Sequence, residues 1–184
     1  MGLAHYADMG SAARVIDLKA AEDAEREELA AAVAGASMVF FSGGKPQHLA
    51  SVVRGTRFEA AVRTALDSGP VYAGCSAGAM VASRAPDLRG TKAGFGSAWL
   101  FGLGLVPNVS FGVHWDKTRY IPGLRAFVTS RMPEGAWFVG IDERTAILGD
   151  GTSWEVHGLG SVAVMGAEDR ATYRAGDRFR TPSV

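Results

Sequence analysis

The chain has 184 residues, which is enough for one domain with a sizeable core, and its 19 basic and 19 acidic residues cancel. This balance disfavours a nucleic-acid or membrane-surface partner and fits a small neutral substrate better. Cys75 is the only cysteine, so no internal disulfide is expected, and a reducing, cytoplasmic location fits. No apolar run approaches the roughly 18 residues of a membrane span.

The first half of the chain alternates between helical and strand patterns. An acidic first turn and an alanine-rich body predict a helix at 21–33, and the apolar run at 37–42 predicts a strand buried on both faces. The expected order is a short helix within 1–12, strand 14–18, helix 21–33, strand 37–42, a glycine loop, helix 56–66, and a strand from residue 70. This alternation predicts a right-handed parallel α/β sheet, in one domain over residues 1–184, whose ligands gather at the carboxyl ends of its strands.

The second half of the chain is less regular. Residues 84–113 are rich in glycine and aromatic side chains, and we expect loop with short helical pieces there. The segments that follow predict a helix at 119–130, a strand at 136–141, and a hairpin-rich end formed by 146–148, 153–157 and 161–165.

A serine surrounded by small residues stands where an apolar strand stops. Residues 74–78 read GCSAG and match GxSxG, whose glycines permit a sharp turn that lifts the Ser76 hydroxyl to the end of the strand. A helix beginning at Ala77 would aim free backbone N–H groups at that hydroxyl. The motif predicts a nucleophile at Ser76; the alternative is a glycine-lined connection without chemistry.

A serine nucleophile needs a histidine base and an acid that orients it. His114 ends an apolar stretch, and we expect it in a partly buried loop. The other three histidines fit surface, loop or strand-end positions better: His5, His48 and His157. Asp142 and Glu143 follow the strand that ends at residue 141, and spacing alone leaves open which of them faces the base, since adjacent side chains diverge.

The glycine loop predicts the rest of such a site. An oxyanion hole would combine the Ala77 N–H with an N–H from the glycine pair at 43–44, which we assign to Gly44. Lys45, the next residue, could meet a substrate carboxylate as a point charge. A phosphate loop is excluded, since GxxxxGK[ST] is not satisfied and Pro46 lacks an N–H. No HExxH or paired-cysteine spacing occurs, so we expect no metal and no cofactor.

Four motifs resemble peptidase family S51, which includes aspartyl dipeptidases and cyanophycinases. They are FFSGG at 40–44, GCSAGA at 74–79, GLGL at 102–105 shortly before His114, and GIDERTA at 140–146. The resemblance implies a three-layer parallel-sheet α/β fold like that of class I glutamine amidotransferases, with a C-terminal β-hairpin. It also implies a serine peptidase that cleaves dipeptides or short peptides through an acyl-enzyme, with Ser76 as nucleophile, His114 as base and Glu143 as orienting acid.

The chain also departs from the family pattern. Members usually begin with an additional strand, helix and strand, so we expect amino-terminal strands to be missing and a homo-oligomer to cover the exposed edge. Cyanophycinases carry an aspartate before the histidine and three arginines after it, where this chain has Gly112, Thr118, Tyr120 and Gly123. We therefore expect Lys45 and Arg119 to contact a short peptide, and no useful activity on cyanophycin.

Two other interpretations remain open from the sequence. One is a relative of the same fold that binds a ligand without turnover. The other is an amidotransferase-type domain with Cys75 as nucleophile, which is disfavoured because Cys75 precedes the apex of the turn and should point back toward the sheet.

Overall fold

The computed structural model describes residues 2–83, 102–130, 132, 134–166 and 169–181. The chain divides into two compact units, Met1–Val39 with Val52–Val71, and Phe40–Ser51 with Tyr72–Val184. The single domain expected from the length stays a prediction. Within the described ranges, no helix combines the length and apolar character that a membrane crossing requires.

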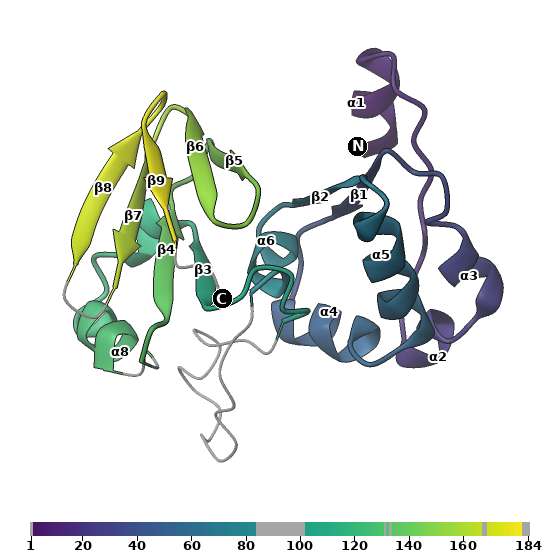
Figure 1. Cartoon of the computed structure of the whole chain (residues 1–184), viewed down its shortest axis with the longest axis horizontal. Helices are drawn as coiled ribbons and strands as arrows, with labels where there is room; N and C mark the ends of the chain where they lie inside the picture. Colours follow the sequence, from purple (N-terminus) through teal and green to yellow (C-terminus); the bar gives the residue numbers. More distant parts are fainter. Residues whose placement is uncertain (1, 84–101, 131, 133, 167–168, 182–184) are drawn as a thin grey trace. The chain divides into compact units, whose positions relative to one another are not determined.

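The first unit is mainly helical. It contains α1 (Gly2–Asp8), α2 (Ala21–Ala24), α3 (Glu27–Ala31), α5 (Arg57–Asp67) and the first residues of β1 (Met38–Phe41) and β2 (Val71–Gly74) (Figure 1). The Thr56 hydroxyl caps α5 by accepting the Glu59 N–H at 3.3 Å, and α5 packs against α3. The expected helices at 1–12 and 56–66 are therefore confirmed.

Two predictions for the first unit are wrong. Residues 14–18 form no strand, since none of the described strands pairs with them, and Arg14 instead donates to the Ala32 carbonyl. The helix expected at 21–33 is split into α2 and α3, because Arg26 adopts an extended backbone with φ −72° and ψ 127°. An extended residue cannot continue the i to i−4 hydrogen bonds, so a second helix begins after it.

The strands β1 and β2 pair in parallel. The Val71 N–H donates to the Ser37 carbonyl and the Cys75 N–H to the Phe41 carbonyl, both at 3.0 Å. Burial alternates along β1: Phe41 is buried and Phe40 is exposed, so the expected burial on both faces is wrong. Val71 on β2 is exposed as well. The homo-oligomer expected to cover such apolar surface stays a prediction.

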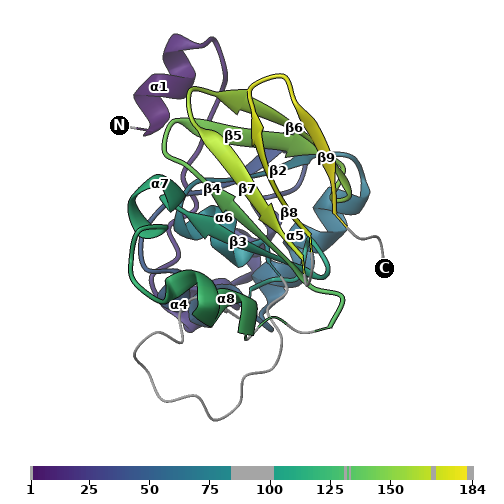
Figure 2. The same cartoon turned by 90° about the vertical axis from the view of Figure 1, so that its left-hand side faces the viewer.

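Besides the last residues of β1 and β2, the described part of the second unit contains two sheets of different strand order. The first has the order β3-β4-β7-β8, in which β3 and β4 are parallel and the other neighbours antiparallel (Figure 2). The second is antiparallel, with the order β5-β6-β9. The strands are β3 (Val109–Val113), β4 (Trp137–Ile141), β5 (Thr145–Gly149), β6 (Ser153–Gly158), β7 (Ser161–Met165), β8 (Arg170–Arg174) and β9 (Arg178–Arg180).

Among its described residues, the second unit also contains the helices α4 (Pro46–Val53), α6 (Ala77–Val81), α7 (Trp115–Thr118) and α8 (Leu124–Ser130), of which α4 ends in the first unit. The expected strand at 136–141 and the hairpin-rich end are confirmed. The loop expected through residue 113 is wrong at 109–113, which forms β3, whereas residues 84–101 lie outside the described part. The fold is thus mixed α/β with parallel and antiparallel sheets. The glutamine amidotransferase-like layout and the missing amino-terminal strands stay predictions.

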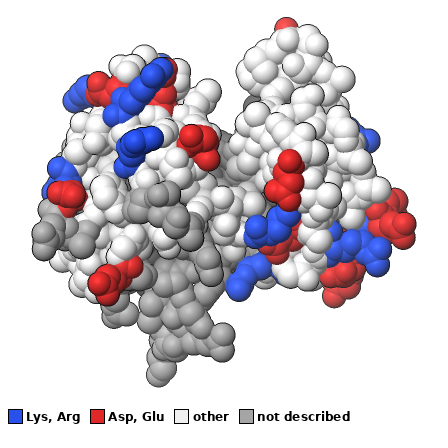
Figure 3. All heavy atoms as spheres, viewed as in Figure 1, with Lys and Arg blue, Asp and Glu red and all other residues white. Residues whose placement is uncertain are grey.

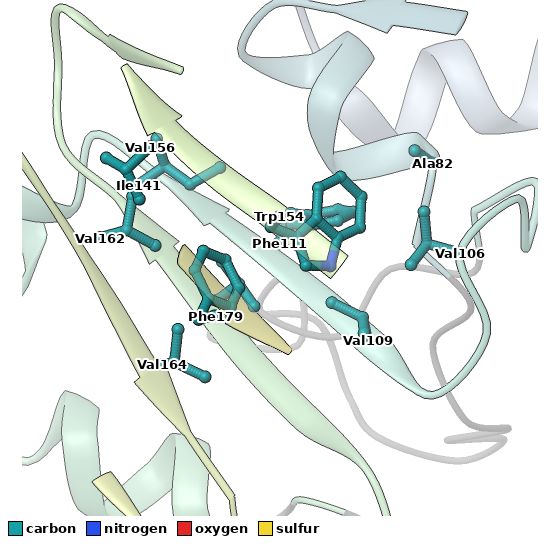
Figure 4. Packing of buried hydrophobic residues seen from close by; sticks show 11 residues of the cluster. Ala82, Val106, Val109, Phe111, Ile141, Trp154, Val156, Val162, Val164 and Phe179 are labelled. Carbon is teal, nitrogen blue, oxygen red and sulfur yellow. The ribbon is translucent and has the colours of Figure 1, made fainter. Parts of the chain in front are cut away.

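One apolar cluster joins both sheets of the second unit (Figure 4). It contains Phe111 of β3, Ile141 of β4, Val162 of β7, and Trp154 and Phe179 of the other sheet. Burial of each such side chain stabilises the fold by about 1.5–3 kcal/mol. The cluster thereby fixes β3 and β4, whose carboxyl ends lead directly to His114 and to Asp142-Glu143.

Surface charges of opposite sign lie close together. On the face in Figure 3, basic side chains are interspersed with acidic ones. Ion pairs of this kind include Arg178 with Glu155 and Lys19 with Asp17. Exposed pairs of this type contribute little to stability.

The turn between β5 and β6 provides a test of pH-dependent stability. Asp150 Oδ1 accepts the N–H groups of Thr152 (2.9 Å) and Ser153 (2.7 Å) and the Thr152 hydroxyl (2.9 Å). These bonds favour the ionised carboxylate and lower the pKa of Asp150 to about 2. A depressed pKa stabilises the fold above the unfolded value of about 4, and this stabilisation is lost as the pH falls through the folded value.

We therefore expect Asp150→Asn to lower the urea midpoint near neutral pH, because the amide carries no charge. The difference between the urea midpoints of wild type and Asp150→Asn should shrink as the pH falls from about 4 to about 2. Urea unfolding at a series of pH values measures it, and a difference that stays constant across this range would contradict the assignment.

Candidate active site

Ser76 lies at the turn between β2 and α6 in an unusual backbone conformation, with φ 52° and ψ −111°. Such a conformation costs on the order of 1–3 kcal/mol and persists only when its surroundings enforce it. The two glycines of the motif help to enforce it, because each lies so close to neighbouring backbone atoms that a side chain would not fit. A Cβ on Gly74 would lie 2.6 Å from the Gly78 carbonyl carbon, and a Cβ on Gly78 would lie 2.0 Å from the Phe41 oxygen. The sequence-predicted strand, turn and helix around Ser76 are therefore confirmed.

Tyr72 holds this turn from within the unit. Its hydroxyl donates to the Gly78 carbonyl at 2.6 Å, and its ring stacks on Phe41 with centroids 5.2 Å apart. Burial raises the pKa of the Tyr72 hydroxyl, so it remains a hydrogen-bond donor at neutral pH. Tyr72 thus ties β2 to the first turn of α6.

Three polar side chains form one continuous chain of contacts. Ser76 Oγ lies 3.2 Å from His114 Nε2, and His114 Nδ1 lies 2.9 Å from Glu143 Oε1. A carboxylate only accepts, so in the neutral ring the hydrogen sits on Nδ1 and Nε2 is free to accept from the serine hydroxyl. The side chains of His114 and Glu143 are 48% and 36% exposed, so solvent reaches the group.

The fold brings these residues together through two parallel strands. His114 directly follows β3 and Glu143 lies just after β4, so both emerge at the same edge of the sheet. His114 adopts a left-handed backbone, φ 53° and ψ 39°, at the N-cap position of α7. The next residue, Trp115, is buried against Phe138 at a ring-centroid distance of 5.1 Å. Arg144, directly after Glu143, also has a positive φ of 57°. Such strain is typical of functional sites.

The choice between Asp142 and Glu143 is decided by the neighbouring strand. Asp142 is buried, and its Oδ2 accepts the Ser161 N–H at 3.0 Å and the Ser161 hydroxyl at 2.7 Å. Asp142 is therefore bound to β7, and Glu143 is the residue that contacts His114.

Two residues of α7 hold Glu143, and the sequence analysis did not identify them. The Glu143 N–H donates to Asp116 Oδ1 at 2.9 Å, and Lys117 Nζ donates to Glu143 Oε1 at 2.5 Å. The bond from Lys117, followed by that from His114, lowers the pKa of Glu143. The only sequence signal for either residue is its place in the first turn after His114.

A family model describes most of this chain. The model of peptidase family S51 matches residues 3–157, a range that includes Ser76, His114 and Glu143. The chain belongs to peptidase family S51.

Solved structures of two proteins are similar to this S51 chain. The crystal structure of a peptidase from an acI-B1 Actinobacterium has a TM-score of 0.83 and 28% identity, over 97% of this chain and 73% of the other. A candidate peptidase E of Listeria monocytogenes EGD-e has a TM-score of 0.50 and 17% identity, over 84% of this chain and 69% of the other, and supports the fold alone. None of the curated proteins matches the chain.

The glycine loop of this S51 member lies beside the serine. A Cβ on Gly43 would be 3.8 Å from Ser76 Oγ, and the next residue, Gly44, has a φ of 147°, which favours glycine. Ala77 is buried at the start of α6. The glycine loop therefore lies beside Ser76, and the roles of Gly44 and Ala77 as oxyanion donors stay predictions.

The two basic residues expected at the substrate differ in their surroundings. Lys45 is exposed directly after the glycine pair. Arg119 Nη1 lies 3.6 Å from Asp142 Oδ2, and its guanidinium sits 5.1 Å from the centre of the Tyr120 ring. Arg119 thus contacts Asp142, the residue before Glu143, and its role at the substrate stays a prediction.

The orientation expected for Cys75 is wrong. Cys75 is exposed rather than turned back into the sheet. Its contact with β1 is made by its backbone N–H, which donates to the Phe41 carbonyl. Within the described part of the chain, no hydrogen bond joins its thiol to a histidine, and no group of three His, Cys, Asp or Glu side chains could hold a metal ion.

Proposed function

We propose that this S51 member is a serine hydrolase that cleaves short peptides through an acyl-enzyme on Ser76. The observation that carries the proposal is the contact chain from Ser76 Oγ through the His114 ring to Glu143 Oε1, with distances of 3.2 and 2.9 Å. This order of nucleophile, base and orienting acid is the one that acyl transfer requires. Membership of peptidase family S51 supports the same reaction class.

The proposed reaction begins when Ser76 Oγ attacks the carbonyl carbon of the substrate and its proton passes to His114 Nε2. Glu143 stabilises the imidazolium that forms. His114 then gives the proton to the leaving amine as the C–N bond breaks, which leaves the acyl group on Ser76. Water attacks this ester with His114 again as base, and the acid product leaves as Ser76 recovers its proton.

The N–H groups of Ala77 and Gly44 are the proposed oxyanion donors. Both belong to segments beside the serine: Ala77 follows Ser76 in α6, and Gly43, which precedes Gly44, approaches the Ser76 side chain. Donors that already point at the developing negative charge stabilise it without reorganisation.

The proposed substrates are dipeptides and short peptides, with an acidic residue met by Lys45. Lys45 is the stronger of the two basic candidates, because Arg119 would have to leave Asp142 and Tyr120 to meet a substrate. The positions at which cyanophycinases hold arginines are occupied by Thr118, Tyr120 and Gly123, so we propose no useful activity on cyanophycin.

Labelling with a fluorophosphonate, followed by peptide mass spectrometry, tests the proposal. We expect the adduct on Ser76, none in Ser76→Ala, and undiminished labelling in Cys75→Ala, which removes the adjacent exposed thiol. An adduct that moves to Cys75, or a wild-type protein that binds short peptides yet reacts with no probe and turns none over, would refute it. The second result would favour a binding protein of the same fold.

A further inference from the structure

One oxygen of Glu143 serves two donors at once. Lys117 Nζ lies 2.5 Å and His114 Nδ1 2.9 Å from the same Oε1. Lys117 is three residues after His114, in α7, so the histidine and the lysine approach the carboxylate from one short segment. With both donors in place, the carboxylate cannot rotate without losing two charge-assisted hydrogen bonds.

The same segment contacts the residues after β4 at two more points. Asp116 Oδ1 accepts the Glu143 N–H at 2.9 Å, and Arg119 Nη1 lies 3.6 Å from Asp142 Oδ2. Among the described residues, Lys117 and His114 contact the Glu143 carboxylate and Asp116 its backbone N–H, with the Arg119–Asp142 pair one residue before and Arg144 one residue after it. Lys117 is the only cation of these, other than a protonated His114, in direct contact with the Glu143 carboxylate.

We propose that Lys117 is a positioning residue whose ammonium holds the Glu143 carboxylate turned toward His114. The effect of Lys117 on turnover rests on the proposed function, whereas the effect of Lys117 on Glu143 does not. The lowered pKa of Glu143, for which the Lys117 bond is the largest cause, agrees with this role.

The cation also acts on the proton held by the base. With Lys117 present, the Glu143 carboxylate interacts with the ammonium as well as with the imidazolium, and the ammonium offsets part of its negative charge. Without Lys117 the whole charge favours the protonated ring, which cannot accept the serine proton. Loss of the cation should therefore harm the reaction more at acidic pH than at alkaline pH, an effect that loss of packing alone would not produce.

The test compares Lys117→Met, Lys117→Arg and a matched control, Arg178→Met. The control removes a cation that is 80% exposed from Glu155, which is 33% exposed, whereas Lys117 and Glu143 are 64% and 36% exposed. The first measurement follows the Glu143 carboxyl carbon by NMR during a pH titration, which needs no activity. The second follows the rate of fluorophosphonate labelling from about pH 5.5 to about pH 8.5.

We expect the pH midpoint of the Glu143 titration to rise in Lys117→Met. In Lys117→Arg and Arg178→Met it should stay near the wild-type midpoint. The ratio of wild-type to Lys117→Met labelling rates should be about threefold larger at the acidic end than at the alkaline end, as for a solvent-screened ion pair. An unchanged Glu143 midpoint in Lys117→Met, or a flat ratio in a protein that labels, would overturn the proposal. A moved midpoint in a protein that never labels would refute the proposed function and leave the role of Lys117 at Glu143 supported.

Discussion

Replacing His114 with alanine is expected to lower kcat on a short peptide as far as replacing Ser76 does, on the order of a million-fold. The reason is that the two residues act as one unit: a hydroxyl without a base is a poor nucleophile, and a base without the hydroxyl has nothing to activate. The Ser76→Ala/His114→Ala double variant should therefore be no slower than either single variant. Steady-state kinetics on one peptide substrate, with removal of contaminating peptidases checked by inhibitor titration, measures all three.

The matched control for this series is His157→Ala. His157 Nε2 lies 3.3 Å from Glu155 Oε1 on β6, in a surface pair that makes no described contact with Ser76, His114 or Glu143. We expect kcat to stay within about twofold of wild type, as for most surface substitutions. Losses that multiply in the double variant, or a fall in His157→Ala comparable to that in His114→Ala, would show that the histidine was wrongly assigned.

The part of the site that could be predicted from the sequence is the part encoded locally. The turn at Ser76 depends on small residues within a five-residue motif, and the chain order of strand, turn and helix needs no distant partner. Both glycines of the motif prove to be sites of close backbone approach. Local chemistry therefore sufficed to predict the turn at Ser76.

The strand that leads to His114 could not be predicted in this way. Residues 109–113 contain Ser110 and Gly112 within a glycine-rich context, and they read as loop. They form β3 because β4 pairs with them and the Phe138 ring covers Gly112, where a Cβ would lie 2.2 Å from the ring. That contact joins residues far apart in the sequence, and periodicity within one segment cannot detect it.

Tertiary contacts also determine which acidic residue contacts His114 and which lysine contacts that acidic residue. Asp142 and Glu143 are adjacent and chemically alike, and only the pairing with Ser161 of β7 removes Asp142 from the choice. Lys117 resembles any exposed lysine until the Glu143 carboxylate is seen beside it. For the fold, the glycine loop concealed α4, although Pro46 as its first residue is typical of a helix start.

Replacing Gly78 with alanine is expected to destabilise the protein by about 2–3 kcal/mol or more, the range of a substitution that forces an extra methyl group into a packed region. In an open helix the same change would stabilise by up to about 1 kcal/mol, because alanine has the higher helix propensity. Here a Cβ would lie 2.0 Å from the Phe41 oxygen and 2.6 Å from its carbonyl carbon. Backbone atoms in a paired strand cannot move aside as a flexible side chain can, so steric overlap outweighs propensity.

The strain should reach the nucleophile as well as the fold. Gly78 is two residues after Ser76, and its carbonyl accepts the Tyr72 hydroxyl, so displacing this turn moves the backbone that holds Ser76 in its positive-φ conformation. We expect the variant to lose labelling under conditions where it is still folded. Urea unfolding and fluorophosphonate labelling are compared with Ala79→Ser, which adds one atom to the next residue, on the less buried side of the same turn. If Gly78→Ala were as stable and as reactive as Ala79→Ser, close approach of α6 to β1 could not be what shapes the turn at Ser76.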